Sequence, residues 1–253
     1  MKKILSLFLT LALVAGTVCA CNKNIGTGSS ASTTATTRPT TQSYTGTVPP
    51  GVEISESLYP GSIVFRADTD SAEENAVKIE RFRSTQINLV IGDTYMDTGG
   101  TIYTVTAVGV ATGHPVYSGS GNLLLTLKVL GGKTSRIGSA AFQGAPTLCN
   151  VWLGDGVESI GDYAFYLCGK LAVVTLPSTL TEIGDAAFGE TAIEEIIIPE
   201  SVTSIGNLAF ANCKSLRKVT MPAAFNNEQT LAAIFADYSA IEFTFTGEST
   251  KNN

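Results

Sequence analysis

The chain has few charged residues and few of the residue types that most catalytic sites need. Only 15% of its 253 residues are charged, 16 of them basic and 22 acidic, and the net charge is -6. An acidic chain whose Lys and Arg are not clustered repels phosphate, which argues against nucleic-acid binding. One histidine, and five cysteines without a C-x-x-C pair, exclude most His-based catalysis, the common structural zinc modules and thioredoxin-type redox sites. The 44% of hydrophobic residues nevertheless suffices for a sizeable core. The composition therefore favours a small binding protein.

Residues 1–20 are predicted to be a secretory signal peptide. Two lysines precede an apolar run over residues 4–14, and small residues then lead to Cys21. The run is shorter than the about 20 apolar residues of a transmembrane helix. The sequence Val18-Cys19-Ala20-Cys21 resembles a bacterial lipobox, which implies cleavage before Cys21 and a diacylglycerol on its thiol. The alternative is an ordinary secreted protein cut nearby. The resemblance implies a protein of the bacterial cell envelope that is lipid-anchored to a membrane and faces outward.

The next segment, residues 21–50, is dominated by Ser, Thr and Gly and has almost no large apolar residue. Such a segment cannot bury enough surface to offset the entropy of ordering it, so it is predicted to be a flexible tether after the lipidated Cys21. A flexible chain of about 30 residues spans about 30 Å on average. The tether would hold the folded part at that distance from the lipid.

A six-residue motif recurs in the second half of the chain. Ile-Gly-x-x-Ala-Phe begins at residues 137, 160, 183 and 205, so its copies are spaced by 23, 23 and 22 residues. A period this short and regular predicts a solenoid, in which each copy forms one coil. The Gly-x-x-Ala-Phe stretch is predicted to be a turn or a single helical turn whose Phe fills the interior of the coil.

Each copy is followed by two aliphatic residues two positions apart, and in three of the four copies a proline comes next. Residues two apart share one face of a strand, and a proline without an N–H closes that strand. The sequence thus predicts one strand per coil, and stacked coils would form a parallel sheet. The aliphatic pairs are Val151 and Leu153, Val174 and Leu176, Ile196 and Ile198, and Val219 and Met221.

Over residues 136–222 this pattern resembles the BspA-like leucine-rich repeats of bacterial surface proteins. The resemblance implies a solenoid of about five coils over residues 122–253, and a role in adhesion to host matrix proteins or to other cells. Residues 105–109 look like a degenerate first turn, and residues 231–245 look like a closing coil. The chain departs from the pattern at Gly154, where proline is usual, and in the third unit, which lacks one residue between Phe188 and Ile193. Loops are expected to tolerate both departures.

Residues 51–121 are predicted to be a β-rich N-terminal cap. Strand-like runs at 61–65, 86–91 and 101–105 surround a turn at 97–100 that is typical of a hairpin. The acidic stretch over residues 68–74 raises the alternative of a calcium loop. It lacks the Gly and the terminal Glu of an EF-hand, so a solvated acidic loop is the favoured interpretation.

No residue pattern predicts an enzyme, a metal site or a cofactor. His114 lies in a loop sequence without a neighbouring acid or nucleophile. Cys168 and Cys213 each follow a repeat Phe by three residues, so they are expected to be buried, free and inert. Cys149 occupies a position that is variable between repeats and therefore expected to be wetter. It is either a reactive thiol or, in the favoured interpretation, a partly covered one.

The outward residues of the predicted strands are the candidate ligand-binding face. Stacking would align them in two columns, and the outward Trp, Val and Ile suggest an apolar patch for a protein ligand on a host or bacterial surface. The alternatives are an ordinary or loop-covered surface and, because tryptophan stacks on sugar rings, a glycan-capture lipoprotein. The two columns comprise Asn150, Trp152, Val173, Thr175, Glu195, Ile197, Lys218 and Thr220.

Overall fold

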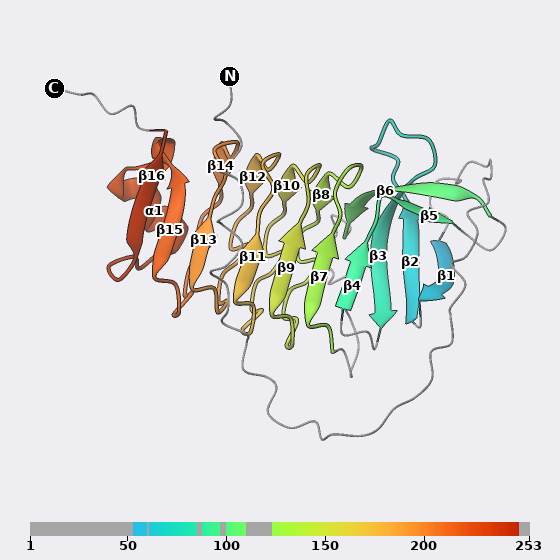
Figure 1. Cartoon of the computed structure of the whole chain (residues 1–253), viewed down its shortest axis with the longest axis horizontal. Helices are drawn as coiled ribbons and strands as arrows, with labels where there is room; N and C mark the ends of the chain where they lie inside the picture. The colour runs from blue at the N-terminus through green and yellow to red at the C-terminus, as the bar shows by residue number, and fades with distance from the viewer. Residues whose placement is uncertain (1–52, 60, 85–87, 97–99, 110–122, 248–253) are drawn as a thin grey trace, which may run out of the picture. The chain divides into compact units, whose positions relative to one another are not determined.

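The computed structural model describes residues 53–59, 61–84, 88–96, 100–109 and 123–247. The predicted signal peptide, Cys21, the tether and His114 lie outside these ranges. The described chain forms a stack of coils that carries strands on two sides, with little helix (Figure 1).

One side of the stack carries the strands that the aliphatic pairs predict. They form a four-stranded parallel sheet of order β11-β9-β7-β4 and a three-stranded parallel sheet of order β13-β15-β16 (Figure 1). The inward residues of β9, such as Val151 and Leu153, are buried, which confirms the predicted alternation. The strands are β4 (Asn88–Ile91), β7 (Thr126–Val129), β9 (Asn150–Leu153), β11 (Val173–Thr175), β13 (Glu195–Ile197), β15 (Lys218–Pro222) and β16 (Glu242–Thr246).

A second sheet runs along another side of the coils, at the Ile-Gly of each repeat. Its strands in the repeats are only two residues long and pair in parallel. They are β8 (Arg136–Ile137), β10 (Ser159–Ile160), β12 (Glu182–Ile183) and β14 (Ser204–Ile205). The sequence predicted turns or short helical segments there and missed this sheet, because two residues are too few to show the alternation that indicates a strand. The turns themselves follow directly after these strands, as predicted.

The glycine of each Ile-Gly pair lets successive coils approach closely. A Cβ built on Gly161 would lie 2.6 Å from the backbone nitrogen of Ser139, and one on Gly184 would lie 2.5 Å from the backbone nitrogen of Asp162. Gly161 N also donates to Ile137 O over 2.8 Å. Only glycine fits at this distance, which explains why it recurs in every copy of the motif.

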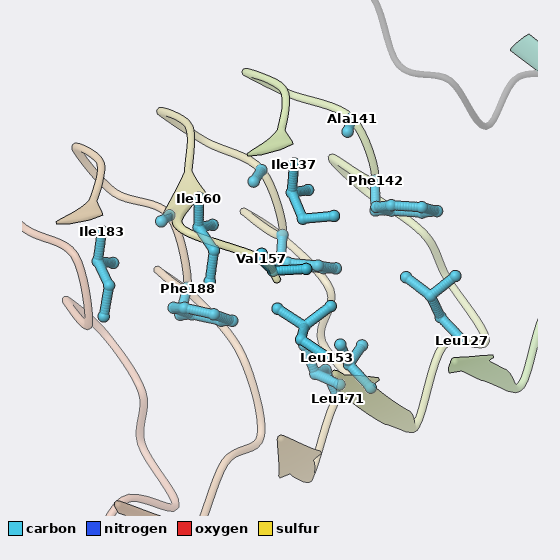
Figure 2. Packing of buried hydrophobic residues seen from close by; sticks show 14 of the residues in the cluster. Leu127, Ile137, Ala141, Phe142, Leu153, Val157, Ile160, Leu171, Ile183 and Phe188 are labelled. Atoms are coloured by element: carbon cyan, nitrogen blue, oxygen red, sulfur yellow. The ribbon is translucent and has the colours of Figure 1, made fainter. Parts of the chain in front are cut away.

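The repeat phenylalanines stack through the centre of the coils. Their ring centroids lie 5.3 to 5.5 Å apart in an unbroken series of near-parallel rings, an offset-stacked geometry that aromatic pairs favour. Figure 2 shows Phe142 and Phe188 projecting into the interior, together with aliphatic side chains from both strand sets. This confirms the predicted interior role of the motif Phe. The series comprises Phe142, Phe165, Phe188, Phe210 and Phe235.

The N-terminal region is β-rich, as predicted. The strands β1 (Glu53–Tyr59), β2 (Gly61–Ala67) and β3 (Ala76–Ser84) pair antiparallel in chain order, and β5 (Thr94–Met96) forms a hairpin with β6 (Ile102–Val108). Because β6 also pairs in parallel with β8, and β4 with β7, the stack begins before residue 122. It therefore has about six turns, one more than expected, and the degenerate turn predicted at 105–109 belongs to it.

The predicted closing coil is also present. A 3-10 helix (η1, Ala223–Phe225) and helix α1 (Glu228–Phe235) precede β16, which pairs with β15. The Asn227 side chain accepts a hydrogen bond from Thr230 N and caps α1. Helix α1 takes the place of the repeat turn, because Phe210 N donates to Ile234 O and the Phe235 ring stacks on that of Phe210.

The main-side sheet is split where the third unit lacks one residue. No backbone hydrogen bond joins β11 to β13, both of which the structure describes. The neighbouring coils do make the equivalent hydrogen bonds: Ala172 N donates to Cys149 O, and Arg217 N donates to Glu194 O. The inward residues Val174 and Leu176 are consequently only half-buried. The loop does accommodate the deletion, as expected, but the neighbouring ladder is interrupted.

Candidate interaction face

Strand register aligns the predicted outward residues in two columns. Asn150 pairs with Val173 and Trp152 with Thr175 in one sheet, while Glu195 pairs with Lys218 and Ile197 with Thr220 in the other. The split between β11 and β13 therefore divides each column in two. The register also adds residues that the sequence analysis did not include, because the first and last coils deviate from the motif. These are Asn88, Val90, Thr126, Lys128, Glu242 and Thr244.

The face exposes several large apolar side chains. Trp152 is 37% exposed, Val173 41% and Ile197 59%. Val90 and Leu130, from the first two coils of the face, are exposed as well. Isolated exposed apolar residues are normal on a protein surface, but a series along consecutive strands of one face is typical of a contact surface.

Trp152 is held in place by its neighbours. The ammonium nitrogen of Lys128 lies 4.6 Å from the centre of the Trp152 ring, a cation–π contact from the preceding strand. A Cβ on Gly154 would lie 3.0 Å from the ring and 2.2 Å from the carbonyl oxygen of Leu130. This explains why glycine stands where other units have proline: the position has no room for a side chain.

Charge on the face is sparse and self-compensated. Lys218 and Glu195, on adjacent strands, form an ion pair over 3.2 Å, and both side chains are about half exposed. An exposed pair of this kind contributes little to stability. Lys218 and Glu195 are two of the eight residues that the sequence predicted for the face, and the other six are uncharged. Contact with a partner there would therefore depend mainly on burial of apolar surface.

Comparison with known proteins identifies the repeats. Residues 133–252 match, in six copies, the family described as BspA type leucine rich repeat region. This part of the chain is a BspA-type leucine-rich repeat region. No curated protein matches the chain.

Solved leucine-rich repeat structures are similar to the chain. One is a leucine-rich repeat protein from Bacteroides ovatus, with 29% sequence identity and a TM-score of 0.53 over 62% of this chain. The chain spans only 39% of that protein. Another is the leucine rich repeat protein of T. pallidum, with 24% identity, a TM-score of 0.54, and coverage of 64% of this chain and 70% of that one, which shows the fold alone. Neither the matched family nor these structures indicates an enzyme; solenoids of this kind typically serve as binding scaffolds.

The three cysteines of the leucine-rich repeat region are buried, and Cys168 and Cys213 are free thiols. Cys168 is fully buried, burial raises its pKa to about 12, and burial also raises the pKa of Cys213. Both are therefore thiols rather than thiolates near neutral pH. The prediction that they are buried and free is confirmed. The expectation of a wetter Cys149 is wrong: the residue is fully buried and its thiol donates to Thr147 O over 3.3 Å. Its variable counterparts Glu194 and Arg217 are exposed, so repeat position alone misjudged its burial.

The acidic loop is not solvated at Asp68. The Asp68 side chain is 3% exposed and contacts other parts of the chain. Lys78 Nζ lies 2.9 Å from Asp68 Oδ1 and 2.8 Å from Asp70 Oδ2, where a bound cation would lie, and Thr106 Oγ1 donates to Asp68 Oδ2 over 2.6 Å. Burial alone would raise the pKa of Asp68 and lower that of Lys78. The hydrogen bonds outweigh it, so the pKa of Asp68 is lowered and that of Lys78 is raised. The solvated-loop interpretation holds for Asp70, which is exposed, and fails for Asp68.

A cavity of about 350 Å³ lies beside Asp68, between the acidic loop and two repeat turns. Lys133 and Glu73, which line it, form an ion pair over 2.6 Å, and Arg136 Nη2 lies 3.8 Å from Asp68 Oδ2. The cavity lining thus carries four carboxylates and two basic side chains, and both basic side chains lie within 4 Å of a carboxylate. Among the described residues, no cluster of three or more His, Cys, Asp or Glu side chains is arranged to hold a metal ion. In the same part of the chain, no helix is long and apolar enough to span a membrane.

Proposed function

We propose that this chain is a lipid-anchored bacterial surface protein whose leucine-rich repeat face binds a protein on a host or bacterial surface. In this proposal Cys21 carries the lipid, residues 21–50 form the tether, and the outward columns around Trp152 make the contact. The anchor is supported by the lipobox resemblance at residues 18–21 and by the BspA-type repeats, a repeat type found in bacterial surface proteins.

The exposed apolar series on the outward face carries the proposal. Trp152, Val173 and Ile197 remain exposed on consecutive strands, although most inward side chains of the same coils are buried. Tryptophan is enriched among the residues that dominate the binding energy of protein interfaces, and large apolar side chains remove much apolar area from water when a partner covers them. A rigid stack of strands also holds these side chains in place, so binding orders little beyond side-chain rotamers.

Glycan capture has weaker support than protein binding. Lys128 lies over the Trp152 ring, and neither column contains another aromatic residue. Sugar recognition would therefore depend on one ring with a cation over it, whereas a protein partner can cover the whole apolar series.

The test is a binding screen with the full chain, immobilised at its N-terminal side, against extracellular-matrix proteins and a glycan panel. Ile197→Glu and Trp152→Glu place a charge in the contact and are expected to weaken binding about tenfold or more, since burying an unpaired charge is costly. Leu208→Glu is the matched control, because Leu208 is 48% exposed at a repeat turn away from the face. It should leave binding unchanged.

The outcomes separate the two hypotheses. Protein binding that both face variants weaken and the control does not would support the proposal. Binding to glycans alone, lost with Trp152→Ala, would replace it with glycan capture. Protein binding that neither face variant alters would place the contact elsewhere on the solenoid and overturn the proposed face.

A further inference from the structure

Strand β16, the last strand that the structure describes, has an open edge. Strand β16 pairs with β15 on one side, and no described strand pairs with its other side. Its length of five residues gives a longer edge than most strands of the main side, which have three or four. Unpaired backbone donors and acceptors along such an edge favour the addition of another strand.

The backbone groups of the open edge can be assigned to particular residues. Glu242 N donates to Arg217 O over 2.8 Å, so the backbone groups of Glu242 point toward β15. Successive residues of a strand direct their N–H and C=O groups to opposite edges. The N–H and C=O groups of Phe243 and Phe245 are therefore directed to the open edge, on either side of Thr244.

The interior is also less covered at this end. Phe243 and Phe245 are only half-buried, whereas Val219 and Met221, their partners on β15, are fully buried. Tyr238, which contacts the Phe243 ring edge-to-face at 6.1 Å, is half-buried too. Solenoids require terminal units with a polar outer face to shield the core. Here the last coil leaves part of its aromatic core in contact with solvent.

We propose that a second copy of this chain pairs antiparallel with β16, about a twofold axis that passes between the two Thr244 residues. In this register Phe243 of one copy lies opposite Phe245 of the other, and each such pair exchanges two backbone hydrogen bonds. These are the groups that point to the open edge. The symmetric order Phe-Thr-Phe makes the edge complementary to itself, and cross-strand aromatic pairs stabilise a sheet.

Charge favours the same register. It places Glu242 opposite Thr246 of the second copy, so the acidic side chain does not face its own counterpart. A register centred on Glu242 would bring two carboxylates together, which destabilises a strand pair. A shift by one residue, centred on Phe243, would place Phe245 opposite Ile241 and would leave one aromatic pair, Phe243 with its own counterpart, in place of two.

The dimer would place the outward columns of both copies on one side of a continuous sheet, because a twofold axis perpendicular to a sheet preserves its faces. A ligand array could then engage both copies at once, which raises avidity without any new contact. The pairing itself does not depend on the proposed ligand-binding role of that face.

Disulfide trapping tests the register. The full chain with Cys19 and Cys21 replaced by Ala keeps only its three buried cysteines. Thr244→Cys in this background should form a covalent dimer under mild oxidation, because Cα atoms of a non-hydrogen-bonded antiparallel pair lie about 4.5 Å apart, within disulfide range. Thr246→Cys is the matched control on the same strand. In the proposed register the two substituted positions would lie four residues apart along the strands, about 13 Å, so this variant should form no covalent dimer.

Sedimentation velocity of the full chain tests the association without a cross-link. The unsubstituted chain should show a monomer–dimer equilibrium, and Thr244→Lys should raise the dissociation constant about tenfold or more, because it places two like charges at the axis. Thr220→Lys, an outward substitution on β15, should not. A monomer at every concentration would overturn the proposal, as would a Thr246→Cys variant that cross-links as readily as Thr244→Cys, or a dimer insensitive to Thr244→Lys.

Discussion

Restoring the missing residue of the third unit should close the split between β11 and β13. Between the buried Thr191 and Ile193 the chain has only Ala192, whereas the second unit has Gly169 and Lys170 at the corresponding place. Insertion of a serine after Ala192 gives this connection the same length. We expect β13 to shift toward β11 and to form the hydrogen-bond ladder that joins β9 to β11.

The magnitude follows from that neighbouring ladder. Strands β9 and β11 pair over three residues, so closure should add about three backbone hydrogen bonds, each with a net contribution of about 0.5–1.5 kcal/mol. Ordering one more loop residue costs about 1–2 kcal/mol. Further burial of Val174 and Leu176 adds to the gain. The free energy of unfolding should therefore rise by about 1–3 kcal/mol.

Two measurements check this expectation. Urea unfolding gives the free-energy difference, and hydrogen exchange should show slower exchange of the amides of β13 in the insertion variant. A serine inserted after Lys170 is the matched control, because that connection already has full length, and it should destabilise the protein. The reasoning is refuted if the insertion after Ala192 lowers stability as much as the control does, or if exchange in β13 is unchanged.

Three further substitutions test the interior and the acidic loop. Phe188→Ala should lower the free energy of unfolding by about 3–5 kcal/mol in urea titrations. Phe188→Leu should lower it by about 1–3 kcal/mol, because it loses two ring stacks but keeps apolar volume; a Phe188→Leu variant as stable as the unsubstituted protein would show that stacking adds nothing. Asp68→Asn should cost about 2–3 kcal/mol at neutral pH, since it leaves Thr106 without a charged acceptor and Lys78 with only the exposed Asp70 as a carboxylate partner. The pKa of Asp68 is lower in the folded chain than its unfolded value of about 3.9, so its contribution is complete above that pH and is lost as the pH falls through the folded pKa. The stability gap between the two proteins should therefore narrow below about pH 4, and a constant gap down to about pH 2 would contradict the assigned ion pair.

The repeat sequence alone predicted most of the fold, because the residue type at each repeat position indicates whether that side chain is buried. The aliphatic pairs two apart predicted the main-side strands, and the recurring Phe predicted the stacked interior. The second sheet was missed because its two-residue strands are held by coil stacking rather than by local alternation. The burial of Asp68 was missed because its partners lie elsewhere in the chain, Thr106 being 38 residues away.

The sequence predicted the candidate site only in the coils that carry the repeat motif, because the motif fixes which residues align on neighbouring strands. The outward positions of regular coils could be numbered from the motif, and strand pairing aligns them as expected. Lys128 could not be predicted to lie over Trp152, because the coil that carries Lys128 lacks the motif ahead of its strand. The split between β11 and β13 could not be predicted either, since a deletion in a loop does not reveal whether the loop or the adjoining ladder accommodates it.

The contrast between interior and surface shows where specificity can reside in this leucine-rich repeat region. Inside the coils the same residue types recur at the same positions, because each Phe must stack on the next and each Gly must clear the backbone of its neighbour. The outward positions carry no such constraint and vary along the stack, as Trp152, Thr175 and Ile197 do. A partner that binds this face therefore contacts side chains that vary from coil to coil, held on coils of nearly uniform interior structure. Substitutions there should alter binding while leaving stability almost unchanged, because they remove no interior contact.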